Sequence, residues 1–256
     1  MAFRITACCL QKGGTGKSST VHALSAGLIL RGYRVLVCDL DPQGNLSHTM
    51  RANTNDKGLF EAFNGDSAVD LIQHTQQGHI LASSQQLVGS DKKFVDVGSE
   101  YLLADALEQI KNDYDYIIID TPPHLGILTV CALVAATDII IPTTSDMYAM
   151  QGLALLAQNI EKIKRRTNPY LRIAGILLTR YSSRSILSRD FKEVIEAQAV
   201  EIGTKVYNTI IREGVAIREA QAQRINIFEC APTSNPAMDY NDFIEEYLNE
   251  GGNTNG

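Results

Sequence analysis

The residues best suited to chemistry stand near the start of the chain, where positions 11–19 read Gln-Lys-Gly-Gly-Thr-Gly-Lys-Ser-Ser. This segment follows an apolar run at 3–10 and precedes an alanine-rich amphipathic stretch, an order typical of a phosphate-binding loop. Glycines let backbone N–H groups turn toward a phosphate, and the start of the next helix adds partial positive charge. We expect Lys17 to interact with the β- and γ-phosphates of a nucleotide, and Ser18 to bind Mg²⁺.

Lys12 is an unusual addition to this loop. An ordinary phosphate-binding loop needs one lysine, at its end, whereas this segment has a second lysine at its start. A lysine there cannot easily fold back onto phosphates held by its own loop, and it is well placed to reach a nucleotide held by a second copy of the chain. The alternative interpretation is a plain strand-to-helix turn with a surface lysine at each end, which the flanking elements and the acidic motifs below disfavour.

Two acidic motifs follow other apolar runs. In the first, Asp39-Leu-Asp41-Pro-Gln-Gly-Asn45, alternation along a strand sends Asp39 and Asp41 to the same side. We expect one carboxylate to hydrogen-bond the water shell of the metal and the other to orient an attacking water. The second, Tyr116-Ile-Ile-Ile-Asp120, ends in an aspartate of the kind that phosphate-loop NTPases place near Mg²⁺. Alone, the first motif would be better explained as a strand that ends in a helix cap; beside the glycine loop it is not.

Strand-like and helix-like segments alternate along the chain. The predicted strands are short and almost continuously apolar, and they cover 5–10, 34–40, 116–119, 138–141, 173–178 and 206–211. The predicted helices cover 18–31, 101–111, 126–136, 151–166, 186–199 and 237–248. This alternation predicts an α/β fold of the P-loop NTPase type, with a doubly wound, mostly parallel sheet and helices on both faces. The nucleotide is expected at the carboxyl ends of the strands.

Length and composition limit the classes of protein that fit. The chain is long enough for one large domain, which we expect to span 1–249, followed by a disordered tail at 250–256. The more polar segment 51–98 is expected to carry short elements at 59–63 and 68–75. A net charge of −6 argues against a general nucleic-acid coat but allows a local basic patch. No stretch is long and apolar enough for a membrane span and no signal peptide is visible, so we expect a cytoplasmic protein.

Together, the three motifs resemble those of the ParA family of deviant Walker A ATPases, relatives of MinD and the nitrogenase iron protein. The resemblance covers nearly the whole chain and includes 12–19, 39–45, 120–126, 175–179 with Arg184, 211–220, and 231–235 with Tyr240. It implies an ATPase that uses ATP and Mg²⁺ and forms a homodimer with ATP sandwiched between the subunits. It also implies nucleoid association through double-stranded DNA bound without sequence preference. The dimer would be released from DNA when a ParB-type centromere-binding protein or a cargo adaptor stimulates ATP hydrolysis. This cycle of binding and release would segregate a plasmid, chromosome or mobile element.

The resemblance also assigns roles to single residues. Lys12 would cross the dimer interface to the partner's phosphates, Ser19 would contact the α-phosphate, and Asp41 would position the hydrolytic water. The implied catalytic residues are Lys12, Lys17 and Asp41. The implied nucleotide-binding residues are Lys12, Gly13, Gly14, Thr15, Gly16, Lys17, Ser18, Ser19 and Arg212. The implied metal-binding residues are Ser18, Asp39 and Asp120, the carboxylates acting through the metal's water shell.

Candidate DNA contacts come from arginines in the second half of the chain. Arg184 matches an arginine that the family uses on the DNA-facing surface of the dimer, whereas a second family arginine falls on Ala216. Arg218 and Arg224 lie close enough in sequence to replace it, and Arg180 is a further candidate. Many relatives have Pro-Arg-Asn against the adenine, where this chain has Arg212-Glu213-Gly214. Each of these arginines has an alternative interpretation as a solvated helix face or a surface ion pair.

Other functions remain as alternatives. A membrane-cycling relative of MinD would end in a basic amphipathic helix, whereas the predicted last helix here is acidic, and anionic lipid would repel it. An iron–sulfur reductase on the same scaffold would need paired cysteines at the dimer axis, and Cys131 alone does not supply them. A MinD-like ATPase or an ATPase that positions a protein cargo is the alternative to DNA partitioning, and no membrane partner is expected.

Overall fold

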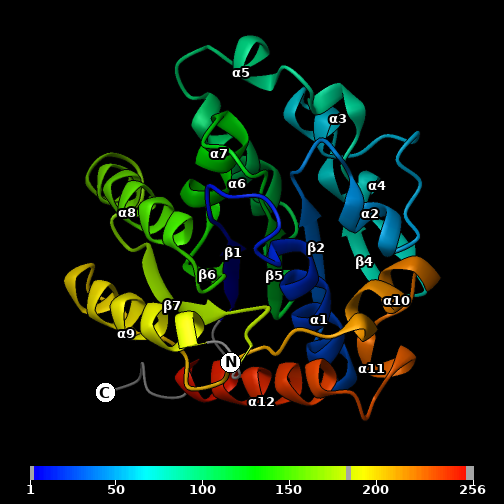
Figure 1. Ribbon diagram of the computed structural model, residues 1–256. Helices are drawn as coiled ribbons and strands as arrows, with labels where there is room; N and C mark the ends of the chain where they lie inside the picture. Colours follow the sequence, from blue (N-terminus) through cyan, green and yellow to red (C-terminus); the bar gives the residue numbers. More distant parts are fainter. Residues whose placement is uncertain (1–2, 183–185, 252–256) are drawn as a thin grey trace.

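The computed structural model describes residues 3–182 and 186–251. Within them, seven strands form one sheet in the order β3-β4-β2-β5-β1-β6-β7, and every neighbouring pair is parallel except β3 and β4 (Figure 1). The strands are β1 (Arg4–Cys8), β2 (Val35–Asp39), β3 (Gln73–Thr75), β4 (Gly78–Leu81), β5 (Tyr116–Asp120), β6 (Asp138–Thr143) and β7 (Arg172–Leu178). The predicted doubly wound, mostly parallel sheet is therefore confirmed.

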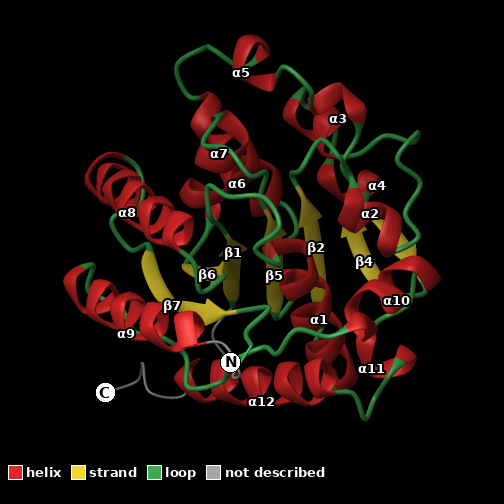
Figure 2. Ribbon diagram, viewed as in Figure 1, coloured by secondary structure: helices red, strands yellow, loops and turns green. Residues whose placement is uncertain are grey.

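Helices cover both faces of this sheet (Figures 1 and 2). The longer ones are α1 (Lys17–Leu30), α6 (Leu102–Glu108), α7 (Ile127–Ala135), α8 (Met147–Arg166), α9 (Ile186–Glu201), α10 (Val215–Gln223) and α12 (Asn235–Gly251). The short ones are α2 (Asn45–Thr49), α3 (Leu59–Phe63), α4 (Ala68–Leu71), α5 (Ser90–Lys93) and α11 (Ile227–Cys230). One face is packed by α1, α10 and α12, and the other by α3, α6, α7, α8 and α9.

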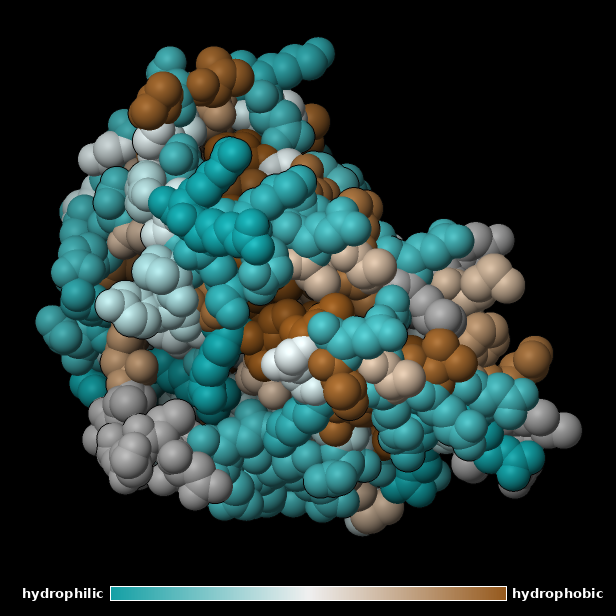
Figure 3. Space-filling view, turned by 90° about the vertical axis from the view of Figure 1, so that its left-hand side faces the viewer, coloured by the Kyte–Doolittle hydropathy of each residue, from teal (hydrophilic) through white to brown (hydrophobic). Residues whose placement is uncertain are grey.

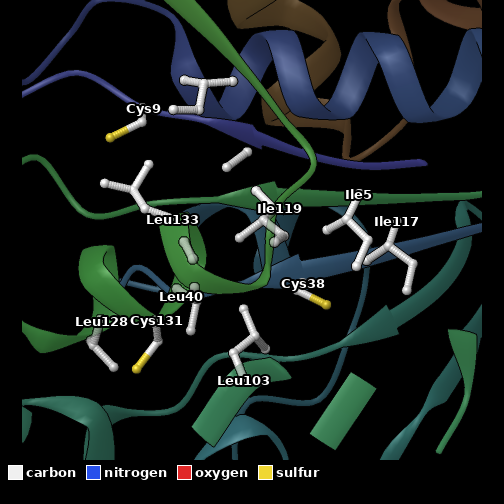
Figure 4. Packing of buried hydrophobic residues seen from close by; sticks show 14 of the residues in the cluster. Ile5, Cys9, Cys38, Leu40, Leu103, Ile117, Ile119, Leu128, Cys131 and Leu133 are labelled. Atoms are coloured by element: carbon white, nitrogen blue, oxygen red, sulfur yellow. The ribbon is translucent and has the colours of Figure 1, made fainter. Parts of the chain in front are cut away.

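Alternation along the buried strands divides the core into two layers. In β5, Ile117 and Ile119 belong to the cluster with α6 and α7, whereas Ile118 belongs to the cluster with α1 and α12. Figure 4 shows Ile117 and Ile119 in the same cluster as Leu103 of α6 and Cys131 of α7. Both layers are largely apolar, so the central strands are apolar at most positions; Thr6 of β1 is an exception, and its hydroxyl is hydrogen-bonded to Tyr247. This explains why the sequence shows continuous runs and not a polar alternation.

Three predicted features differ from the structure. The segment 206–211 is not a strand: it runs beside β7 with separate hydrogen bonds, from Tyr207 N to Ile176 O and from Ile211 N to Leu178 O, and forms no ladder. The hairpin of β3 and β4 was not predicted, because β3 is polar and part-exposed and β4 has only two buried apolar residues, Ile80 and Leu81. Helix α12 reaches Gly251, so the first two residues of the predicted tail are helical, and 252–256 lie outside the described residues.

The side of the molecule that carries α8 and α9 is mainly hydrophilic, with apolar residues gathered near its centre (Figure 3). The large apolar side chains exposed on these two helices are Met147, Leu155, Leu187, Val194 and Val200. Among the described residues, no helix combines the length and hydropathy that crossing a membrane would require.

Candidate functional site

The predicted phosphate loop joins β1, in the middle of the sheet, to α1. Gly14 and Gly16 adopt positive φ angles of 75° and 82°, which side chains disfavour and glycine accepts. The first α-helical hydrogen bond from this turn runs from Thr20 N to Gly16 O, so the N–H groups at the start of α1 have no partner within the helix. This is the geometry of an anion site at a helix N-terminus.

Lys17 lies inside the loop. Its side chain is almost fully buried, and its Nζ donates to the carbonyl oxygen of Lys12 at 2.9 Å. Burial lowers the pKa of Lys17, and the carboxylates of Asp120 and Asp41 oppose this. The ammonium group of Lys17 therefore lies between the loop and the carboxylates of Asp120 and Asp41. A phosphate bound in the loop would be a further negative group beside it.

Asp39 and Asp120 are neighbours on adjacent strands and are both buried. Asp39 accepts hydrogen bonds from the backbone N–H and hydroxyl of Ser47, at 2.8 and 2.6 Å, and from Asp41 N at 3.2 Å. Burial raises the pKa of Asp39 to about 6 despite these bonds. Its carboxylate thus anchors the start of α2, and its predicted role in the water shell of a metal stays a prediction.

Asp120 differs from Asp39 because neither carboxylate oxygen has a hydrogen-bond partner among the described residues. Burial raises its pKa well above the usual value, Asp39 adds to the increase, and Ser18 and Lys17 oppose it. A buried carboxylate with unused lone pairs beside a loop hydroxyl fits the environment of a hydrated divalent cation. Within the described residues, no cluster of three or more His, Cys, Asp or Glu forms a site made by protein ligands alone.

A pocket of about 870 Å³ opens beside the loop. The loop residues lining it run from Gly13 to Ser19, and Asp41 and Pro123 border the phosphate end. Farther along, Ile211, Ile217 and Tyr240 supply apolar and aromatic surface. A charged end beside the loop and an apolar end beyond it suit a nucleotide, whose phosphates and base have these two characters.

Lys12 lies outside this pocket. Its Nζ donates to Thr144 Oγ1 at 3.1 Å and forms an ion pair with Asp146, and all three residues line a second, smaller hollow. The structure therefore does not bring Lys12 together with Lys17 inside the nucleotide pocket.

The remaining predicted site residues are dispersed. Arg212 does not line the pocket, because its guanidinium is paired with the buried Asp239 through Nε and Nη2. Arg218 lines the pocket. The Nε of Arg224 donates to His48 O at 2.7 Å. Arg184 lies outside the described residues.

Several pocket residues were not found from the sequence. His22 is buried on α1, its Nε2 has no partner among the described residues, and burial lowers its pKa to about 4. Gln221 donates to Ser19 Oγ at 3.1 Å, and Thr179 Oγ1 donates to Thr15 O at 2.8 Å. Thr179 and Arg180 follow the carboxyl end of β7, a position that the general rule for ligand sites in parallel sheets could have indicated.

Comparisons with known proteins agree with this geometry. A family model described as "AAA domain" matches residues 3–173, and one described as "4Fe-4S iron sulfur cluster binding proteins, NifH/frxC family" matches residues 97–254. The chain is 34% identical to the chromosome-partitioning ATPase Soj of Thermus thermophilus, over 93% of this chain and 92% of that protein. It is 35% identical to the sporulation initiation inhibitor protein Soj of Bacillus subtilis, over 97% and 99%.

A solved structure is also similar over the whole length. Cobyrinic acid a,c-diamide synthase from Mycobacterium smegmatis with bound ADP and magnesium superposes with a TM-score of 0.86 at 30% identity, covering 98% of this chain and 96% of that chain. The cysteines offer no sign of the cluster named in the second family description: Cys131 is buried, and its thiol donates to Ser99 O.

Proposed function

Because the chain belongs to the ParA family of P-loop ATPases, we propose that it is an ATP-dependent DNA-partitioning ATPase that works as an ATP-sandwich dimer. The observation that carries this proposal is the position of Lys12. An ATPase that acted as a monomer would have no need of a lysine on the outer rim of its loop, away from its own nucleotide pocket. A lysine in that position suits the phosphates of a second copy, as in a two-fold symmetric dimer.

The chemistry would be water attack on the γ-phosphorus of ATP, with cleavage of the bond to the β,γ-bridging oxygen and release of ADP and phosphate. Lys17 and the N–H groups at the start of α1 would hold the phosphates. Asp41 lines the pocket and would orient the water. Ser18 and, through water, Asp120 would hold Mg²⁺, which neutralises phosphate charge when bound.

Dimerisation would require Lys12 to leave Asp146. This ion pair is partly exposed, with side-chain exposures of 25% and 38%, so water weakens the attraction that must be broken. The free lysine would then reach the phosphates bound by the partner, and hydrolysis would reverse the exchange. We therefore expect slow turnover by the chain alone and faster turnover with a ParB-type partner or cargo adaptor.

DNA binding would depend on the dimer. A chain with net charge −6 is a poor ligand for a phosphate backbone, but two copies of Arg184, Arg218 and Arg224 on one surface would form a basic patch. The resemblance supports Arg184 most directly. Arg218 and Arg224 are proposed with it because they lie on or directly after α10.

The first test is sedimentation of the chain with ATP and Mg²⁺. Wild type should dimerise, and Lys17→Ala should lose nucleotide binding. Lys12→Ala should bind ATP but dimerise poorly, whereas Asp41→Ala should accumulate as the ATP-bound dimer. A wild-type chain that stays monomeric in saturating ATP would refute the mechanism.

The second test measures DNA binding on two unrelated duplexes over a series of salt concentrations, with ATP and with ADP. We expect ATP-dependent binding that is equal for both duplexes and weakens steeply as salt rises. Arg184→Ala should weaken both and reduce the salt dependence. Equal binding in the two nucleotide states, or none in either, would favour the alternative of a protein-positioning ATPase.

A further inference from the structure

We propose that Arg180 is an additional phosphate-binding residue of this pocket, which contacts the terminal phosphate of a nucleoside triphosphate and so distinguishes it from a diphosphate. This inference rests on the proposed nucleotide-binding function of the pocket. It concerns a residue that the phosphate loop itself does not include.

The backbone that carries Arg180 is fixed to the phosphate loop. The preceding residue, Thr179, is buried, and its hydroxyl donates to Thr15 O at 2.8 Å. Arg180 Nη1 donates to Gly14 O at 3.2 Å, and Arg180 lines the pocket together with the loop. A guanidinium group is therefore held beside the residues that would surround the phosphates.

The backbone conformation of Arg180 is uncommon for its residue type. Its φ is +52°, in the left-handed region that favours glycine. Neighbouring hydrogen bonds hold this turn, from Tyr181 N to Ile211 O and from Glu213 N to Tyr181 O. Strained conformations of this kind persist where the surroundings determine them and gather at ligand sites. Here the turn directs a long cationic side chain toward the loop, which a glycine in the same conformation could not provide.

The contacts of Arg180 can be exchanged for stronger ones. Nη2 forms an ion pair with Glu213 at 3.1 Å, but the two side chains are 51% and 55% exposed, and pairs that open to water are weak. The other partner, Gly14 O, is a neutral carbonyl. A terminal phosphate carries more charge and accepts a guanidinium through two parallel hydrogen bonds. We infer that a triphosphate draws Arg180 away from Glu213, whereas a diphosphate lacks the group that would do so.

Arg180 also stands at a boundary. Gly13, Gly14, Arg180 and Glu213 line both the nucleotide pocket and the hollow that contains Lys12. The Arg180–Glu213 pair forms part of the wall between them. Movement of Arg180 toward a triphosphate would open this wall on the side from which the partner's lysine is proposed to enter.

The test compares the affinities of a non-hydrolysable ATP analogue and of ADP by equilibrium fluorescence. Arg180→Gly removes the side chain and suits the positive φ, so the variant should fold. We expect it to bind the triphosphate about tenfold more weakly and ADP within about twofold of wild type. Arg180→Lys should recover part of the loss because it keeps the charge but not the paired hydrogen bonds. Glu213→Gln should strengthen triphosphate binding, because it weakens the competing contact. Arg189→Ala, on an exposed part of α9, is the matched control and should change neither affinity.

The outcomes separate this proposal from the one on which it rests. If Lys17→Ala abolishes binding while Arg180→Gly leaves the triphosphate-to-diphosphate ratio unchanged, the role of Arg180 is refuted and the pocket is still a nucleotide site. Weakened DNA binding with unchanged nucleotide affinities in Arg180→Gly would assign the residue to the DNA surface, which also refutes the proposal. Wild type that binds neither nucleotide would overturn both.

Discussion

Protonation of His22 should destabilise the folded chain by an amount that the structure allows us to work out. An ordinary histidine has a pKa of 6.5, whereas burial lowers the pKa of His22 to about 4, with the Gln77 side chain opposing the decrease. Between these values the unfolded chain binds a proton that the folded chain excludes, so stability rises with pH across this range. At about 1.36 kcal/mol for each pKa unit, His22 should remove about 3 kcal/mol of stability as the pH falls from 7 to 4.

The assay is urea unfolding at several pH values between 4.5 and 7.5 without nucleotide. Other groups titrate in the same range: the raised pKa of Asp39, about 6, makes its contribution run the opposite way, with stability lost as pH rises. The measured quantity is therefore the difference in pH dependence between wild type and His22→Gln. That difference should reach about 2.5 kcal/mol between pH 7.5 and 4.5, with the variant less sensitive to acid.

Equal pH dependence in wild type and His22→Gln would refute the reasoning. It would mean that His22 is hydrated in the folded chain, so that its pKa is ordinary. A reversed difference would mean that the ring gains a partner for its second proton, which the structure does not provide for Nε2.

Three further predictions concern other buried groups. Asp120→Asn should abolish the stability that Mg²⁺ with ATP adds in thermal melts, because it removes the carboxylate proposed to hold the hydrated cation. Gly126→Ala should lower the free energy of unfolding by about 1 kcal/mol in urea, because its Cβ would lie 2.4 Å from Asp91 Oδ1 and displace the carboxylate that caps α7. Asp91→Ala should lower it by the same amount. The double variant should lose little more than either single variant, because both changes remove the same cap. Arg4→Met should cost about 1–2 kcal/mol by the same method, because it removes the buried ion pair with Asp138 while Arg172 continues to pair with that carboxylate.

The sequence predicted the central sheet well, for a physical reason. Strands covered on both faces need apolar residues at most positions, and the runs ending at Asp39 and Asp120 are therefore conspicuous. The same criterion failed at the edges. The segment 206–211 is apolar because Tyr207 and Ile211 pack against α12 and α10, not because it joins the sheet. The edge strand β3 is polar and part-exposed, and β4 beside it has only Ile80 and Leu81 as buried apolar residues, too few to form a conspicuous run.

The candidate site was predictable where its residues stand at the ends of strands. The loop and both acidic motifs lie at strand ends, and parallel strands bring their carboxyl ends together. The sequence could not show that Ser47 satisfies Asp39, or that Asp239 takes up Arg212 from 27 positions away. These pairings depend on tertiary contacts of single polar groups, which leave no periodic pattern in the chain.

The difference between Asp39 and Asp120 bears on how binding and stability are linked. Burial raises the pKa of both carboxyl groups, and the neighbouring Asp39 adds to the increase at Asp120. Ser47 donates two hydrogen bonds to Asp39, whereas neither carboxylate oxygen of Asp120 has a hydrogen-bond partner among the described residues. The nucleotide-free pocket therefore retains an unfavourable charge that a hydrated cation would relieve. A nucleotide with its hydrated cation can bind only the folded chain. Its binding should therefore raise the free energy of unfolding, and the stabilising contacts should lie around Lys17 and Asp120.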